Sequence, residues 1–155
     1  MRWIALMLCL SPLAANAATN ELIVSVVAGS QAPTSFKYPL DGDKHELDMR
    51  VSHRYDAAFK DTATNRDVCR EGMYKTGLLL TLRSLPKDES GNQQVEVIGQ
   101  VSTLDGVNPG LKLKCGTNQE VMLSNKAFSD TVRIEKNRTK VVVIDGTYTV
   151  MVKVE

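Results

Sequence analysis

Glu46 to Tyr55, with the sequence ELDMRVSHRY, is the stretch that decides the fold. Its side chains alternate strictly, so that one set can face a core while the charged and polar set faces water. A period of two over ten residues predicts a β-strand with one buried face. His53 falls on the core side, where a partly buried, hydrogen-bonded histidine is the expected structural role. The core-facing set is Leu47, Met49, Val51, His53 and Tyr55.

Short β-branched segments with the same character extend in both directions from this strand. They are residues 21–28, 35–40, 77–85, 94–104, 111–115, 120–123, 131–135, 139–144 and 147–154. The pair Asp145-Gly146 between the last two is a strong hairpin signal, because a type I′ turn needs positive φ at both central positions. About eight to ten short strands separated by turns predict an all-β fold. We expect a single antiparallel β-sandwich, with a small β-barrel as the alternative.

Asp56 to Lys75 lacks the strand period. We therefore expect a long loop here, with room for one short helical turn at residues 57–60. Long ordered loops often carry a function, so this segment is the candidate binding surface. A crossover between two sheets, without a binding role, is the alternative interpretation. The candidate binding residues are Phe59, Lys60, Arg66, Asp67, Arg70 and Tyr74.

Two cysteines, Cys69 and Cys115, lie outside the first seventeen residues. In an exported chain such a pair predicts a disulfide. A redox pair usually has Cys-x-x-Cys spacing, which is absent. A zinc site with His45 and His53 would match no finger or ribbon spacing, and the two histidines would lie about 26 Å apart on a straight strand. We expect neither a metal nor a cofactor.

The first seventeen residues have the pattern of a secretory signal peptide. Arg2 supplies the positive start, an apolar run follows, and Ala15-Asn16-Ala17 resembles a cleavage site. Cleavage would leave residues 18–155 as a single β-rich domain, in the periplasm or secreted. No later apolar run approaches the roughly 20 residues of a membrane-spanning helix, so no membrane span is expected.

Charge provides no signal for a nucleic-acid partner. The chain has 19 basic and 18 acidic residues, and loss of Arg2 with the leader leaves 18 of each. A neutral, locally mixed charge pattern offers no basic surplus for a phosphate backbone. A nucleophile elbow, a phosphate-binding loop, a zinc-protease helix and a calcium loop are also missing from the sequence. We therefore expect a protein that is not an enzyme and does not bind nucleic acid.

Three segments of the second half resemble the β-domain of bacterial secretins, the outer-membrane rings of secretion and pilus machines. They are residues 76–82 (TGLLLTL), residues 95–102 (VEVIGQVS) and residues 139–146 (TKVVVIDG). The chain lacks the length and the preceding periplasmic modules of a secretin, so it cannot itself be the pore. The resemblance implies a small envelope protein of similar β-topology, and no functional residue is carried over from it.

These observations favour an exported, non-enzymatic binding or accessory protein with a protein partner in the cell envelope, such as a secretion or pilus assembly. Binding could use an exposed strand edge or the segment 56–75. A periplasmic or secreted inhibitor of a foreign hydrolase is the alternative, because a disulfide-held loop would suit it. An enzyme without a known motif is the third hypothesis.

Overall fold

A computed structural model describes residues 20–155. The expected signal peptide, residues 1–17, lies outside the described residues. The described part of the chain consists of eight strands joined by turns. They are β1 (Glu21–Ala28), β2 (Thr34–Pro39), β3 (Lys44–Asp61), β4 (Arg66–Leu85), β5 (Gln93–Leu113), β6 (Gly116–Ile134), β7 (Thr139–Ile144) and β8 (Tyr148–Val154).

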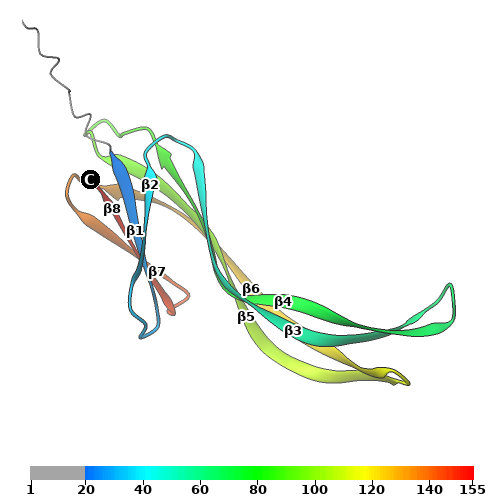
Figure 1. The fold of residues 1–155 in the computed structure, drawn as a ribbon. Coiled ribbons are helices and arrows are strands. Elements are labelled where there is room, and N and C mark those ends of the chain that lie inside the picture. The colour runs from blue at the N-terminus through cyan, green and yellow to red at the C-terminus, as the bar shows by residue number, and fades with distance from the viewer. Residues whose placement is uncertain (1–19) are drawn as a thin grey trace, which may run out of the picture.

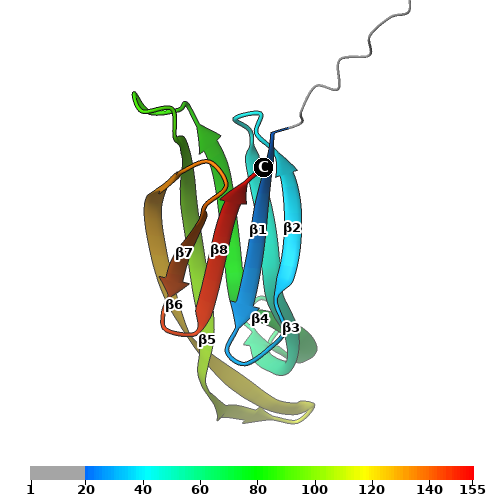
Figure 2. The same ribbon diagram turned by 90° about the vertical axis from the view of Figure 1, so that its left-hand side faces the viewer.

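The strands form two antiparallel four-stranded sheets that pack face to face (Figures 1 and 2). The short sheet has the order β2-β1-β8-β7, and the long sheet has the order β3-β4-β5-β6. Antiparallel pairing of sequential neighbours follows from their short connections, and the first and last strands, β1 and β8, also pair antiparallel. The predicted antiparallel β-sandwich is therefore confirmed, and its sheets do not close into the alternative barrel.

The core lies between the two sheets and is built by alternate residues of each strand. On the short sheet, Leu22 and Val24 of β1 and Val150 and Val152 of β8 are fully buried. From the long sheet, Leu78, Leu80 and Leu82 of β4 and Val95 and Val97 of β5 face them. These aliphatic side chains supply the burial that stabilises the sandwich, at about 25 cal/mol for each Å² of apolar surface removed from water.

The two sheets differ greatly in length. Strands of the short sheet have 6–8 residues and span about 20–26 Å, whereas strands of the long sheet have 18–21 residues and span about 60–70 Å. The long sheet therefore continues past the sandwich as a curved projection (Figure 1). We call this projection the arm and define it as residues 51–76 and 103–124. The buried core cluster contains no residue of the arm.

Gly77 marks the point at which β4 leaves the sandwich. Its φ is +122°, a value that side-chain-bearing residues rarely adopt. A Cβ at this position would also lie 2.8 Å from the backbone oxygen of Met49 on the neighbouring strand. Only glycine allows this bend at such close approach, and Gly77 is the first residue of β4 to pair with β5, opposite Ser102.

The expectation of a loop at residues 56–75 is wrong. This segment is the outer part of the β3–β4 hairpin, paired without interruption to Asp61↔Arg66, and a four-residue turn closes it. No short helix forms at residues 57–60. The strand period is absent because no second sheet covers the arm, so the sequence there has no single buried face to encode.

The long strands β5 and β6 also run through positions where the sequence predicted breaks. Asp105-Gly106 and Asn108-Pro109-Gly110 lie within β5, where the pairing with β6 shifts at Leu104/Gly106 and at Pro109/Lys112. Glycine and proline are tolerated at such irregularities. The predicted segments 120–123 and 131–135 are parts of the single strand β6. At the end of the chain, Asp145 (φ 50°) and Gly146 (φ 67°) confirm the predicted hairpin turn.

Candidate functional site

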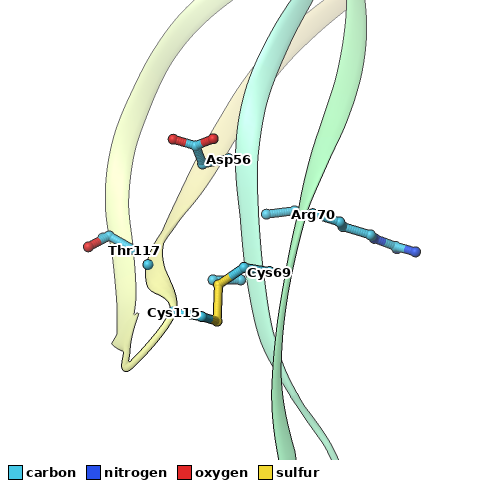
Figure 3. A pocket seen from close by; sticks show the side chains of 8 residues that line it. Asp56, Cys69, Arg70, Cys115 and Thr117 are labelled. Carbon is cyan, nitrogen blue, oxygen red and sulfur yellow. A yellow bond between two sulfur atoms is a disulfide. The ribbon is translucent and has the colours of Figure 1, made fainter.

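The arm consists of two hairpins that separate from each other beyond the last β4–β5 pair. One is made by β3 and β4, and the other by β5 and β6. The predicted disulfide Cys69–Cys115 is present and joins them, with its Cα atoms 6.0 Å apart (Figure 3). Cys69 belongs to β4 and Cys115 to the β5–β6 turn, so the covalent link lies far out on the arm.

Side-chain oxygens of one hairpin bind backbone N–H groups of the other. Asn118 Oδ1 accepts from the N–H of Ala58 at 3.0 Å, and Gln119 Oε1 accepts from the N–H of Asp56 at 2.7 Å. Asp67 Oδ2 accepts from the N–H of Lys114 at 3.2 Å. Since β3 has β4 on one side only, the two amide oxygens satisfy donors on its otherwise open edge.

A cavity of about 330 Å³ lies between the hairpins, next to the disulfide (Figure 3). Asp56 and Arg70 bring opposite charges to its lining, and the Arg70 side chain points away from the disulfide. Residues 57, 58 and 117 and the two cysteines add small side chains. The cavity lacks the convergent polar groups that fix a small ligand in a specific pocket.

The structure divides the predicted binding residues between two places. Five of them lie on the outer half of the arm. There Lys60 is opposite Asp67 in the backbone register of the hairpin, and the Arg70 guanidinium lies 5.1 Å from the centre of the Phe59 ring. The sixth, Tyr74, lies nearer the sandwich on the same strand, about 13 Å from Arg70 and about 26 Å from Arg66. The outer group comprises Phe59, Lys60, Arg66, Asp67 and Arg70.

Tyr74 belongs to a groove of about 450 Å³ where the arm leaves the sandwich. We call it the corner groove. Its walls come from the end of the short sheet and from three strands of the long sheet. The lining residues are Ala28, Gln31, Met49, Val51, His53, Tyr74, Thr76, Gly77, Ser102, Thr103, Leu104 and Tyr148.

Aromatic rings and one hydrogen bond order the floor of the corner groove. His53 and Tyr74, directly opposite each other on β3 and β4, stack with ring centres 5.0 Å apart. Tyr55 adds a tilted contact to Tyr74 at 6.2 Å. The Nε2 atom of His53 lies 2.8 Å from Thr76 Oγ1. The predicted role of His53, a partly buried and hydrogen-bonded residue, is confirmed.

None of the twelve lining residues is Asp, Glu, Lys or Arg. In a chain that is 24% charged, this makes the corner groove chemically distinct from the surface around it. Val51 is 61% exposed and Leu104 is 43% exposed, so apolar surface remains open to solvent there. An uncharged, concave, partly apolar surface is suited to burying uncharged groups of a partner.

Sequence reasoning placed Met49, Val51 and His53 on a core-facing side but did not identify the groove. The available signal was the length of this alternating strand, which exceeds the 6–8 residues that the other sheet can cover. Val51 lies beyond the last core residue of β3, Leu47, and is therefore exposed.

Among residues 20–155, no group of three or more His, Cys, Asp or Glu side chains is arranged to hold a metal ion. The same residues include no helix with the length and apolarity needed to cross a bilayer. Comparison with known proteins finds no matching family model, no similar curated protein and no similar solved structure.

Proposed function

We propose that this chain is an exported, non-enzymatic binding protein of the cell envelope, and that the corner groove receives a segment of its protein partner. The observation that carries the proposal is the uncharged groove with open apolar surface at the base of the arm. The resemblance of residues 76–82, 95–102 and 139–146 to secretins supports a secretion or pilus assembly as the partner.

The arm supports a binding role because the sandwich does not need it. It contributes no residue to the buried core cluster, yet ordering each arm residue costs about 1–2 kcal/mol of conformational entropy. The hairpin pairing, the disulfide and the amide bonds across the hairpins offset this cost. Such a rigid projection enlarges the surface available to a partner without lengthening a flexible loop.

The lining determines the chemistry of the segment that we expect in the groove. A charged side chain would lose hydration there without gaining an opposite charge, which is unfavourable. Apolar or aromatic side chains would cover Val51 and Leu104 and could stack on the rings of His53 and Tyr74. The expected partner segment is therefore an extended, uncharged and largely apolar stretch of polypeptide.

Site-specific photocrosslinking in cells tests the proposal. A photoreactive residue at Val51 should give a crosslink to one defined envelope protein. The matched control is the same residue at Glu89, which is exposed in the β4–β5 turn and is not part of the groove lining. If both positions capture the same set of proteins, the corner groove is not the binding site.

A pair of substitutions at one position adds a chemical test. Val51→Asp introduces a charge into the groove and should abolish co-purification of the partner that the photocrosslink identifies, whereas Val51→Ile should retain it. Since Val51 is 61% exposed, neither change should unfold the protein, and thermal melting checks this. A complex that survives Val51→Asp would contradict binding of an uncharged segment.

Inhibition of a foreign hydrolase remains the second candidate, favoured by the two disulfide-joined hairpins that project from the body. An inhibitor of this form would insert its tip, so Phe59→Ala and Arg70→Ala should weaken it while Val51→Asp has little effect. The reverse pattern is expected for the groove-binding protein. Binding measurements on these three variants therefore separate the two functions.

A further inference from the structure

We infer that β7 pairs with β7 of a second copy of this chain, so that two short sheets join into one eight-stranded sheet across a two-fold axis. This inference does not depend on the function proposed for the corner groove. At the edge of the short sheet, β7 has β8 on one side and no strand on the other.

The edge of β2 and the edge of β3 in the arm carry features that discourage pairing, whereas in β7 the one such feature is Lys140, its second residue. On the opposite edge of the short sheet, β2 carries Lys37 and ends in Pro39, which has no N–H to donate. The edge of β3 in the arm is occupied by the side-chain oxygens of Asn118 and Gln119. By contrast, β7 has the sequence TKVVVI, its ladder with β8 is regular, and it contains no proline.

Two valines of β7 are strongly exposed on the outer face of the short sheet. Val141 is 52% exposed and Val143 is 64% exposed, while Ile144 of the same strand is buried in the core. An edge strand with open backbone groups and exposed valines is a template for another strand. The regular pattern also means that pairing would require no rearrangement of the body.

Self-pairing matches these residues to one another. In an antiparallel pair centred on Val142, Val141 of one copy lies opposite Val143 of the other, and the reverse contact follows by symmetry. Four valines would then form one cluster on the outer face. The side-chain period of two keeps the buried faces of both sheets on the same side in this register.

Charge at the two ends of β7 favours the antiparallel arrangement of two copies. The start of β7 is basic, with Lys136, Arg138 and Lys140 against the single acidic residue Glu135. The acidic residue Asp145 follows its end. Asp145 already accepts from Lys126 at 2.7 Å, so a carboxylate is present and ordered there. Pairing centred on Val142 places Thr139 opposite Asp145 of the second copy and Lys140 opposite its Ile144, so that the basic start of one strand lies beside the acidic end of the other.

Light scattering after size exclusion, on the full chain purified under oxidising conditions, tests the inference. We expect twice the monomer mass, and we expect a Val141→Lys/Val143→Lys variant to have the monomer mass. Met73→Lys is the matched control, because Met73 is 67% exposed but lies on the arm, and it should remain dimeric. Melting curves establish that each variant is folded.

Cysteine crosslinking tests the register. A mixture of Val141→Cys and Val143→Cys chains should form an interchain disulfide more readily than either variant alone. A wild-type chain that remains monomeric up to about 100 μM overturns the inference, and so does a double lysine variant that stays dimeric. Preferential self-crosslinking of either single variant overturns the proposed register and, with it, the four-valine cluster.

Discussion

Two glycines of the long sheet are covered by aromatic rings from the directly opposite residue. Phe128 lies over Gly99, and Tyr55 lies over Gly72. A Cβ at Gly99 would be 2.2 Å from the Phe128 ring and 2.9 Å from the backbone oxygen of Leu79. The ring therefore occupies the space that a side chain would need, and each glycine serves packing rather than flexibility.

Gly99→Ala should destabilise the protein by about 1–3 kcal/mol, because Phe128 must move away from the core that it packs against. Gly106→Ala is the matched control. Its Cβ would approach only the flexible end of Met122, at 3.2 Å. Urea unfolding measures both variants, and equal midpoints for the two would contradict this account of Gly99.

At the same scale, Asp48 is held as a carboxylate by its neighbours. The Arg50 side chain donates to both of its oxygens at 2.8 Å, the Arg50 backbone N–H donates at 3.0 Å and Lys75 donates at 3.1 Å. These bonds, led by those from the Arg50 side chain, hold the pKa of Asp48 well below its ordinary value.

A lowered pKa in the folded state predicts the direction of the pH dependence. The carboxylate contributes stability above its unfolded pKa of about 3.9, and the contribution is lost as pH falls through the lower folded value. Asp48→Asn should therefore be less stable than wild type at pH 7, and the difference should narrow below about pH 4. Urea unfolding across this range measures it. The control is Asp130→Asn, an exposed position, and a difference for Asp48→Asn that is constant with pH would refute the prediction.

At the scale of the elements, the disulfide joins two hairpins that otherwise meet through a few polar contacts. It closes a loop of 46 residues that includes the core-forming parts of β4 and β5. In the chain-entropy model, such a crosslink contributes about 3–4 kcal/mol.

Reduction should lower the melting temperature by roughly 10 °C. It should also expose the outer arm to trypsin, with cleavage after Lys60, Arg66, Lys112 or Lys114, because the hairpins are then free to separate. A Cys69→Ser/Cys115→Ser variant should behave like the reduced protein. An unchanged melting temperature would show that the crosslink does not stabilise the fold.

For the whole molecule, the sandwich should fold without the outer arm. Residues 54–73 and 104–123 contribute nothing to the buried core cluster. His53 lies opposite Tyr74, and Thr103 lies opposite Ser124. Each hairpin could therefore be closed at these pairs by a two-residue Asn-Gly turn, which matches the twist of the strands.

Such a shortened chain should retain a cooperative thermal transition, measured by circular dichroism. Its control is a chain with only the β5–β6 hairpin shortened, which should also remain folded. Loss of the cooperative transition in the shortened chain would show that the arm is part of the folding unit.

Sequence patterns predicted the sandwich well where both sheets meet. The limits of β1 and β7 agree with the predicted strands 21–28 and 139–144, and Asp145-Gly146 forms the predicted turn. In these segments, alternate side chains enter the core or β-branched residues dominate. The local sequence pattern is therefore enough to predict each strand. The disulfide partners were also predictable, since no other cysteine lies in residues 18–155.

The arm and the corner groove could not be predicted in the same way. Residues 56–75 are held as strands by backbone pairing across the hairpin, and this pairing imposes no hydrophobic period where no second sheet covers a face. Likewise, the groove brings Ala28, Val51 and Leu104 together from three distant segments.

The sequence by itself therefore determined the all-β class, the antiparallel body and the crosslink, because burial imposes a local pattern on side chains. Only the tertiary structure decided that the strands of one sheet are much longer than those of the other. Strand length depends on which strands pair with a neighbour over their full length. The same difference in length leaves Val51 uncovered and creates the uncharged groove, a property that no single segment encodes.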